Sequence, residues 1–462
     1  MNGVFVVGAG PAGIFAAGKV ALAGFEVFLF NRDIKPGGLA EYGIYPRKEK
    51  MKAGLRKQFA QVLDLPNVHY FGHVHVGSAY DVPIEELESL RPAAIVFACG
   101  AQGARQLGLP GEDAKGVYAA KDFVYHYNRL PPYASMDFSA GKRIAIVGMG
   151  NVAIDIARWL LEDDPDRVAE NVLVVARRRP LEIKFDEKEL DFIERHMARD
   201  ELGRELERVR DRCARCGQDV SPQRIFEHHF LHLKDADFAS IPPRLSFRFL
   251  SSPEAILPDA NGRIARLVVL ENDLVRKDDG STAAIPTWER AEIEADTLIF
   301  AIGDRHDPRI GLPIGPDGFA TAPRPDQPAE PSFELWDQNA RCALPGRYVA
   351  GWARHASAGL AGIARHDGEV CAQKVIDFVR DAPDSATAGE RRILASLEAR
   401  GLRVVTAADL VLLARAEARE ALARQLASFT FADNEAMFRA IDEERERLCA
   451  SRAEEHLLQP AP

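Results

Sequence analysis

Two glycine-rich segments have residue types and spacing that could bind a pyrophosphate. Residues 8–13 read Gly-Ala-Gly-Pro-Ala-Gly, and residues 148–153 read Gly-Met-Gly-Asn-Val-Ala. Each segment follows a short apolar run and precedes a small-residue pattern that predicts a helix. In this context the backbone N–H groups at a helix N-terminus can hold the pyrophosphate of a dinucleotide. The sequence therefore predicts two dinucleotides, and the simplest use for two is to pass electrons from one to the other.

Arginines after the second glycine segment indicate which dinucleotide binds there. The expected strand 172–176 runs directly into Arg177, Arg178 and Arg179. At this place an acid binds the ribose hydroxyls of NAD or FAD, whereas an arginine accommodates the 2′-phosphate of NADP. The triplet favours NADP(H), and the alternative is a solvated basic loop. In the first unit the same place holds Asn31, which can still bind a ribose hydroxyl, with Asp33 two residues further on.

The six cysteines are too scattered for a disulfide framework. Cys213 and Cys216 alone have a spacing that is typical of redox or metal sites, and a metal there would need two further ligands. His228 and His229 are the nearest candidates, but their spacing matches no recognised pattern. We therefore expect no metal site and no iron–sulfur cluster within the chain.

The elements that must position these groups follow from hydrophobic patterning. Residues 1–35 predict strand, turn, helix and strand, and residues 93–98 a buried strand. The second unit continues with a helix at 152–161, a strand at 172–176 and mostly strands between 245 and 303. A strand at 347–350 and a helix at 359–380 follow. The tail is rich in Ala, Glu and Arg, which predicts helices with charged faces.

This order predicts an α/β fold with two Rossmann-like dinucleotide-binding domains, the second inserted into the first, and a helical C-terminal tail. The expected limits are 1–108 for the first part of the first domain and 109–330 for the second domain. Residues 331–383 would complete the first domain, and 384–462 would form the helical extension.

Composition is that of a globular protein of 462 residues, with 47% hydrophobic and 28% charged residues. The net charge of −10 argues against a general nucleic-acid binder. Lys19 and Glu26 interrupt the apolar opening segment, which is explained as strand, turn and helix rather than as a membrane span or signal peptide. We therefore expect a cytoplasmic protein without a membrane or nucleic-acid partner.

Several segments along the chain match one family. They are 8–13, 38–44, 109–112, 150–158, 177–181, 188–190, 249–253 and the pair Gly351-Trp352. The most specific are Gly-Asn-Val-Ala-x-Asp-x-Ala-Arg at 150–158, Arg-Arg-x-Pro-Leu at 177–181 and the Gly-Trp pair, where related flavoproteins more often have Gly-Asp. On these motifs the chain resembles the adrenodoxin reductase type of ferredoxin–NADP reductase, a flavoprotein with two dinucleotide-binding domains.

The resemblance implies FAD in the first domain and NADP(H) in the second, with hydride transfer at flavin N5 and an iron–sulfur partner such as ferredoxin. The residues that it implies for FAD are Gly8, Gly10, Pro11, Ala12, Gly13, Asn31, Gly38, Leu39, Gly43, Gly100, Gly351, Trp352, Gly359 and Leu360. Those for NADP(H) are Gly150, Asn151, Val152, Arg177 and Arg178. Glu189 matches an acid near the nicotinamide, and Trp352 and the Gly359 backbone would face the flavin near N1–O2. These three are the candidate catalytic residues.

Two segments depart from the family pattern. Residues 354–360 read Arg-His-Ala-Ser-Ala-Gly-Leu, whereas the family has Lys-Arg-Gly-Pro-Thr-Gly-Val. This change leaves nicotinamide placement and coenzyme preference open. The family's Pro-Asp-His reads Pro46-Arg47-Lys48, which removes a histidine that could handle protons or dock a partner. Residues 42–46 also look like the glutamate synthase small subunit, which carries a cysteine-rich segment before its FAD fingerprint.

Three other functions are alternatives to a ferredoxin reductase. A disulfide reductase would need a cysteine pair against the flavin, and neither the loop after Gly38 nor the segment before Gly148 contains one. A dedicated electron-transfer subunit of a larger iron–sulfur 2-oxoacid or aldehyde oxidoreductase would use the same chemistry, and a nucleotide-sensing module would have lost turnover. Between Arg195 and Arg224 eight arginines face six acids, which indicates either a docking face for an acidic ferredoxin or a solvated helix with paired charges.

Overall fold

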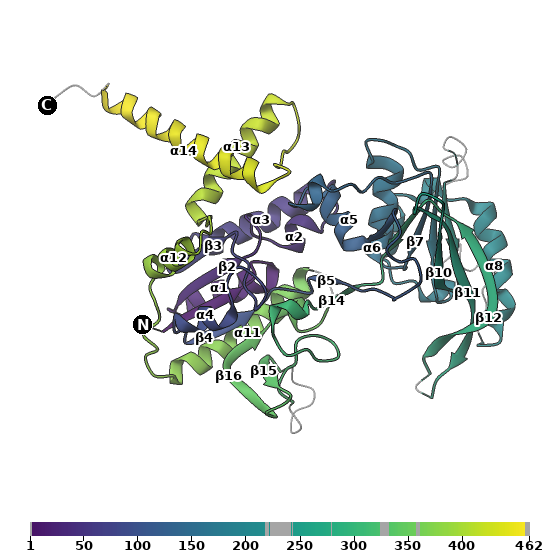
Figure 1. Cartoon of the computed structure of the whole chain (residues 1–462), viewed down its shortest axis with the longest axis horizontal. Helices are drawn as coiled ribbons and strands as arrows, with labels where there is room; N and C mark the ends of the chain where they lie inside the picture. Colours follow the sequence, from purple (N-terminus) through teal and green to yellow (C-terminus); the bar gives the residue numbers. More distant parts are fainter. Residues whose placement is uncertain are drawn as a thin grey trace. The chain divides into compact units, whose positions relative to one another are not determined.

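The computed structural model describes residues 2–217, 221, 242, 244–278, 280–323, 332–356 and 361–457. The chain forms two compact units (Figure 1). The first unit comprises Met1–Gly103, Tyr125–Met136 and Gly303–Pro462, and the second comprises Ala104–Val124 and Asp137–Ile302. The second unit is thus inserted into the chain of the first. The finer division at residues 108, 330 and 383 stays a prediction.

A six-stranded sheet forms the core of the first unit, in the order β15-β16-β4-β1-β2-β3. All neighbours are parallel except β15 and β16. The central strands are continuous apolar runs because both faces of the sheet are buried. The strands are β1 (Gly3–Val7), β2 (Glu26–Asn31), β3 (Val68–Gly72), β4 (Ala94–Phe97), β15 (Glu334–Asp337) and β16 (Cys342–Val349).

Small residues let helix α1 pack closely against helix α11 in the first unit. A Cβ on Gly368 of α11 would lie 2.2 Å from the carbonyl oxygen of Ala12 in α1. Buried residues of both helices and of the sheet form one hydrophobic core. The helices of this unit are α1 (Pro11–Leu22), α2 (Leu39–Tyr42), α3 (Glu49–Leu63), α4 (Ile84–Ser89), α11 (Ala361–Asp381), α12 (Glu390–Ala399), α13 (Ala407–Ala423) and α14 (Asn434–Leu457). Helix α5 (Ala120–Tyr127) and the short strands β5 (Gly103–Ala104) and β14 (Asp304–Arg305) lie where the chain passes between the units.

The second unit contains a parallel sheet and an antiparallel one. The parallel sheet has the order β6-β13-β7-β8-β9, and the antiparallel sheet has the order β10-β11-β12. The strands are β6 (Val117–Ala119), β7 (Arg143–Val147), β8 (Asn171–Val175), β9 (Leu245–Arg248), β10 (Ser251–Pro258), β11 (Ile264–Arg276), β12 (Thr282–Glu294) and β13 (Thr297–Phe300). The helices are α6 (Asn151–Arg158), α7 (Glu187–Leu190) and α8 (Arg199–Ala214).

The predicted strand–turn–helix units are confirmed, with differences at their ends. The helix predicted over 152–161 ends as an α-helix at Arg158 and continues as a π-helical turn over Trp159–Asp163. The strand predicted over 245–250 divides because Leu250 has a φ of 49°, which separates β9 from β10. Among the described residues, no helix is long and apolar enough to cross a membrane.

Candidate dinucleotide-binding sites

The first glycine turn joins β1 to α1, and each of its three glycines meets a different steric demand. Gly8 has a φ of 107°, and a Cβ there would lie 2.5 Å from the Ala98 carbonyl oxygen. A Cβ on Gly13 would lie 1.9 Å from the Gly8 carbonyl oxygen, so α1 packs tightly on the turn. A Cβ on Gly10, by contrast, would meet no described atom within 4 Å. The turn is therefore open at Gly10, where a pyrophosphate can approach the backbone.

The second glycine turn repeats this geometry between β7 and α6. Gly148 has a φ of 128°, and a Cβ there would lie 2.2 Å from the Ala301 carbonyl oxygen. A Cβ on Gly150 would meet no described atom within 4 Å, and Ala153 is fully buried at the third place. In the described part of the chain, no side chain caps the start of α1 or α6. Backbone donors and a positive dipole end therefore lie beside open space, which fits a pyrophosphate.

A second loop of the first unit lies against the open turn. The N–H of Gly37 donates to the carbonyl oxygen of Ala9 at 2.7 Å, and a Cβ on Gly38 would lie 3.3 Å from the Cα of Gly10. The short helix α2 begins directly afterwards at Leu39. The N–H of Gly43 closes this helix on the carbonyl oxygen of Leu39 at 2.9 Å. The structure thus brings Gly38 to Gly10 and places Leu39 and Gly43 in the same short segment.

A third segment reaches the start of α1 from the end of β16. Gly351 has a φ of 67°, and a Cβ there would lie 2.6 Å from the Cβ of Ala12. The N–H of Gly351 donates to the Asp367 carboxylate at 2.6 Å. Nε2 of His306 lies 2.7 Å from the carbonyl oxygen of Trp352, and because that oxygen can only accept, this nitrogen carries the proton. Asp367 and His306, which the sequence did not point to, hold this turn in place.

Asn31 lies beneath the first glycine turn and is 5% exposed. Its Oδ1 accepts a hydrogen bond from the N–H of Ala9 at 3.0 Å. Its Nδ2 donates to the carbonyl oxygens of Asp33 and Lys35, at 2.8 and 3.0 Å, and lies 3.1 Å from the Tyr70 hydroxyl. The amide nitrogen is fully engaged, and one lone pair of Oδ1 remains for a ribose hydroxyl. Asn31 supports the turn, while its contact with a ribose stays a prediction.

The other residues predicted for the first site are less constrained by the structure. Gly100 has a φ of 71° and follows β4, the neighbour of β1 in the sheet. Pro11 occupies the first position of α1, where its missing N–H costs no helical hydrogen bond. Gly359 and Leu360 lie outside the described residues.

The second site is supported by the segment that follows its arginines. Oδ1 of Asn151 accepts a hydrogen bond from the N–H of Asp186 at 2.7 Å, which fixes this side chain at the start of α6. Val152, the next residue, is 46% exposed. Glu189 is half-buried on α7, which packs against α6. The structure therefore brings Asn151, Val152 and the helix of Glu189 together.

The three arginines after β8 differ in their surroundings. Arg178 and Arg179 both pair with Glu182, at 3.2 and 2.9 Å. Arg177 is exposed and forms no ion pair with a described residue. Its carbonyl oxygen accepts a hydrogen bond from Nδ2 of the fully buried Asn272 at 2.8 Å. Sequence reasoning missed Glu182 and Asn272, although Glu182 lies only five residues after Arg177.

Comparisons with known proteins agree with this geometry. Residues 2–221 match the family model for pyridine nucleotide-disulphide oxidoreductases. NADPH-ferredoxin reductase FprA of Mycobacterium leprae is 32% identical over 417 residues, covering 84% of this chain and 86% of that protein. The mitochondrial NADPH:adrenodoxin oxidoreductase of Arabidopsis thaliana is 26% identical over 445 residues, covering 87% of each. The chain belongs to the family that contains FprA and the adrenodoxin reductases.

The fold and the class of enzyme follow from this membership. The structure of Mycobacterium tuberculosis FprA in complex with NADPH superposes with a TM-score of 0.77 at 26% identity, covering 95% of this chain and 99% of that one. The predicted α/β architecture with two Rossmann-like domains is confirmed, as is the resemblance to ferredoxin–NADP reductases. Like the rest of the family, the chain is an oxidoreductase.

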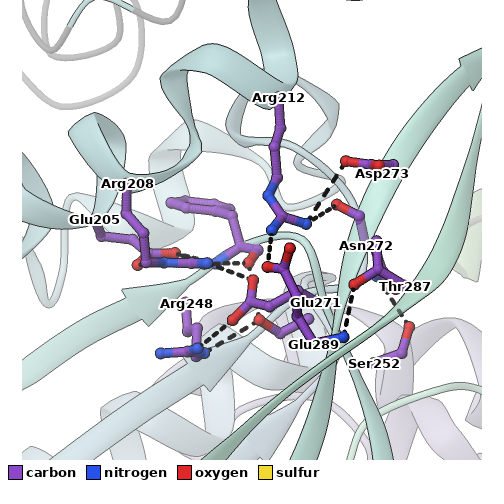
Figure 2. Close-up of polar contacts among 12 residues, drawn as sticks. Glu205, Arg208, Arg212, Arg248, Ser252, Glu271, Asn272, Asp273, Thr287 and Glu289 are labelled. Atoms are coloured by element: carbon purple, nitrogen blue, oxygen red, sulfur yellow. Dashed lines mark hydrogen bonds and ion pairs between the residues drawn. The ribbon is translucent and has the colours of Figure 1, made fainter.

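In this reductase, the arginines around α8 are mostly paired with acids of the same unit. Arg208 binds Glu205 and Glu271, and Arg212 binds Glu289 (Figure 2). Arg195, Arg210 and Arg215 pair with Glu162, Glu207 and Asp273. Arg224 lies outside the described residues. The pairing favours the alternative of a helix with satisfied charges over a docking face for ferredoxin.

The cysteine pair of the reductase is part of the same helix packing. Cys213 is buried in α8, and burial raises the pKa of its thiol to about 11. The Cys216 thiol donates to the Leu274 carbonyl oxygen at 2.9 Å. Among the described residues no three His, Cys, Asp or Glu side chains are grouped as metal ligands, and His228 and His229 lie outside them.

Proposed function

We propose that the chain passes electrons between NADP(H) and a ferredoxin or another iron–sulfur protein, with FAD between them. FAD and NADP(H) are the cofactors of its family. One observation carries the assignment of the two sites. Among the described residues both glycine turns are open and uncapped, and the second leads to an arginine, Arg177, that forms no ion pair with any of them. When bound, FAD supplies hydride chemistry at N5 and single-electron exchange with the partner.

The residues of the first unit bind and orient FAD. The N–H groups at the start of α1, beside Gly10, hold its pyrophosphate, and Gly8 and Gly13 keep the strand and helix close enough for this contact. The segments Gly38–Gly43 and Gly351–Ala353 lie on the same turn and border the cofactor. Trp352, Gly359 and Leu360 are assigned to FAD by the family motif, as are Asn31 and Gly100.

The residues of the second unit bind NADP(H). The N–H groups beside Gly150, Asn151 and Val152 hold the pyrophosphate, and Arg177 binds the 2′-phosphate with Arg178 in support. Glu189, on the helix packed against α6, is assigned to the nicotinamide end by the family motif. The predicted cytoplasmic location stays a prediction, since the relatives include mycobacterial and mitochondrial proteins.

Anaerobic reduction of the flavin by NADPH and by NADH tests this function. We expect the wild-type protein to be reduced at lower NADPH than NADH concentrations, because a guanidinium binds the 2′-phosphate that NADH lacks. Arg177→Ala should raise the half-saturating NADPH concentration by about 10-fold or more and leave that for NADH unchanged. Arg178→Ala should have a smaller effect, since Arg178 already pairs with Glu182.

Arg210→Ala is the matched control, because Arg210 is exposed and pairs with Glu207 on the surface of α8. This variant should change the half-saturating concentration of neither NADPH nor NADH. A protein that is reduced better by NADH, and that responds to neither Arg177→Ala nor Arg178→Ala, would contradict the NADP(H) assignment. Electron transfer from NADPH to an oxidised ferredoxin, and from a reduced ferredoxin to NADP+, is then measured with the same preparation.

A further inference from the structure

Glu182 is held between two of the three arginines that follow β8. Its two carboxylate oxygens lie 3.2 Å from Nη1 of Arg178 and 2.9 Å from Nε of Arg179. The hydroxyl of Thr282, the first residue of β12, donates to the same carboxylate at 2.6 Å. The Glu182 side chain is only 17% exposed, so its charge is poorly screened by water. One negative charge therefore lies within the arginine loop itself.

The backbone of this loop is fixed to the neighbouring strands. Nδ2 of Asn272 binds the carbonyl oxygen of Arg177, and the N–H of Leu250 binds the carbonyl oxygen of Arg178 at 3.2 Å. Asn272 is fully buried, and Nδ2 also donates to the Ser252 hydroxyl at 2.9 Å (Figure 2). The loop cannot easily move Glu182 away from the arginines without breaking these contacts. The carboxylate is a fixed part of the site.

We propose that Glu182 is a specificity-determining residue that weakens the 2′-phosphate site and shifts coenzyme preference toward NAD(H). The inference rests on the proposed function, because it concerns the same NADP(H) site. Glu182 pairs with both Arg178 and Arg179, offsets one of the three positive charges of the loop and repels a doubly charged phosphate. Arg177 is the one arginine of the triplet that forms no ion pair with a described residue. The arginine triplet alone suggests a phosphate site with three positive charges, whereas the structure adds one negative charge that two of the arginines share.

Binding of two nucleotide fragments to the FAD-loaded protein tests this inference. Adenosine 2′,5′-bisphosphate carries the 2′-phosphate and 5′-AMP lacks it, and neither contains a nicotinamide. We expect Glu182→Gln to tighten binding of the bisphosphate by about 3- to 10-fold and to leave 5′-AMP unchanged. The gain should shrink as salt rises from 0.05 to about 0.5 M, since it is electrostatic. A gain in affinity that came from altered packing would not depend on the salt concentration.

Two further variants keep the outcome clear. Glu182→Asp retains the charge and should stay nearer to the wild type than to Glu182→Gln. Glu292→Gln removes a carboxylate from an exposed pair with Arg266, in the sheet that also contains Thr282. This variant should change the binding of neither probe. If Glu182→Gln binds the bisphosphate as the wild type does or more weakly, and still binds 5′-AMP, the proposed role of Glu182 is overturned while the NADP(H) site stands. Equal binding of both probes by the wild-type protein overturns the NADP(H) site itself, and this inference with it.

Discussion

Asp367 uses both oxygens of its carboxylate to hold the Gly351 turn, the segment that we propose to border FAD. Oδ2 accepts the hydrogen bond from the N–H of Gly351, and Oδ1 pairs with the guanidinium of Arg354. These side chains are only 14% and 12% exposed, and the Arg354 guanidinium lies 4.6 Å from the centroid of the Phe333 ring. Charge-assisted bonds that are shielded from water are stronger than surface pairs. A single side chain from α11 thus fixes the backbone of the Gly351 turn.

Replacing Asp367 with Asn should loosen this turn and leave the charge of Arg354 without its partner. We expect the dissociation constant of FAD to rise by about 10-fold, or about 1.4 kcal/mol, together with a lower melting temperature. Flavin release on dilution, followed by fluorescence, measures the first effect. Glu369→Gln, which breaks an exposed pair with Arg365 on the same helix, should change neither quantity. Equal FAD retention by the two variants would show that Asp367 has no part in the site.

At the scale of elements, the two closely spaced glycines of the first turn should respond differently to the same substitution. Gly10→Ala adds a methyl group where no described atom lies within 4 Å, so the protein should fold with an unchanged melting temperature in the absence of FAD. The methyl group would occupy the space that we propose for the pyrophosphate, and FAD binding should weaken by at least about 10-fold. Gly13→Ala, whose Cβ would lie 1.9 Å from the Gly8 oxygen, should destabilise the fold itself by about 1–3 kcal/mol.

The same substitution in the second unit is the control for this prediction. Gly150→Ala should keep FAD bound and weaken NADPH binding, because the open space beside Gly150 belongs to the other turn. Thermal unfolding with and without FAD, and flavin absorbance of the purified variants, distinguish these outcomes. Loss of FAD from Gly150→Ala and not from Gly10→Ala would reverse our assignment of the two sites.

The elements and glycine turns could be predicted because their signals are local, as in the apolar run before Gly8 and the small residues after it. The roles of the polar residues could not be predicted from the sequence, because their hydrogen-bond and ion-pair partners are distant in the chain. Asn31 occupies the position where the sequence predicts a ribose contact, but its amide oxygen accepts a hydrogen bond from the N–H of Ala9 and its amide nitrogen lies 3.1 Å from the Tyr70 hydroxyl. The phosphate-binding capacity of Arg178 depends on Glu182, whose position is fixed by Thr282, one hundred residues further on. Spacing in the sequence identifies such residues but does not show which of them are already paired with other side chains of the protein.

At the scale of the whole molecule, the C-terminal helices connect to the loop that follows β2. Helices α13 and α14 pack side by side (Figure 1). Their buried residues form a cluster with Ile34. Lys35, the next residue, lies 2.9 Å from Glu417 of α13 and 3.6 Å from Glu41 of α2. Burial alone would raise the pKa of Glu41, but the hydrogen bonds from Arg56 and the charges of Lys35 and Arg56 hold it below its usual value. A continuous set of charges therefore joins the C-terminal helices to the segment beside Gly10.

This connection predicts that a change in α13 weakens FAD binding without any contact with the cofactor. Glu417→Gln removes the charge that holds Lys35, whose side chain is 14% exposed, and frees the loop between β2 and Gly38. We expect FAD to dissociate several-fold faster, because ordering this loop then has to accompany binding. Glu420→Gln breaks only an exposed pair with Arg424 on the same helix and should leave the rate unchanged. If both variants release FAD at the wild-type rate, the pair of Lys35 with Glu417 is not needed to order the loop. The C-terminal helices would then stabilise the first unit without affecting FAD binding.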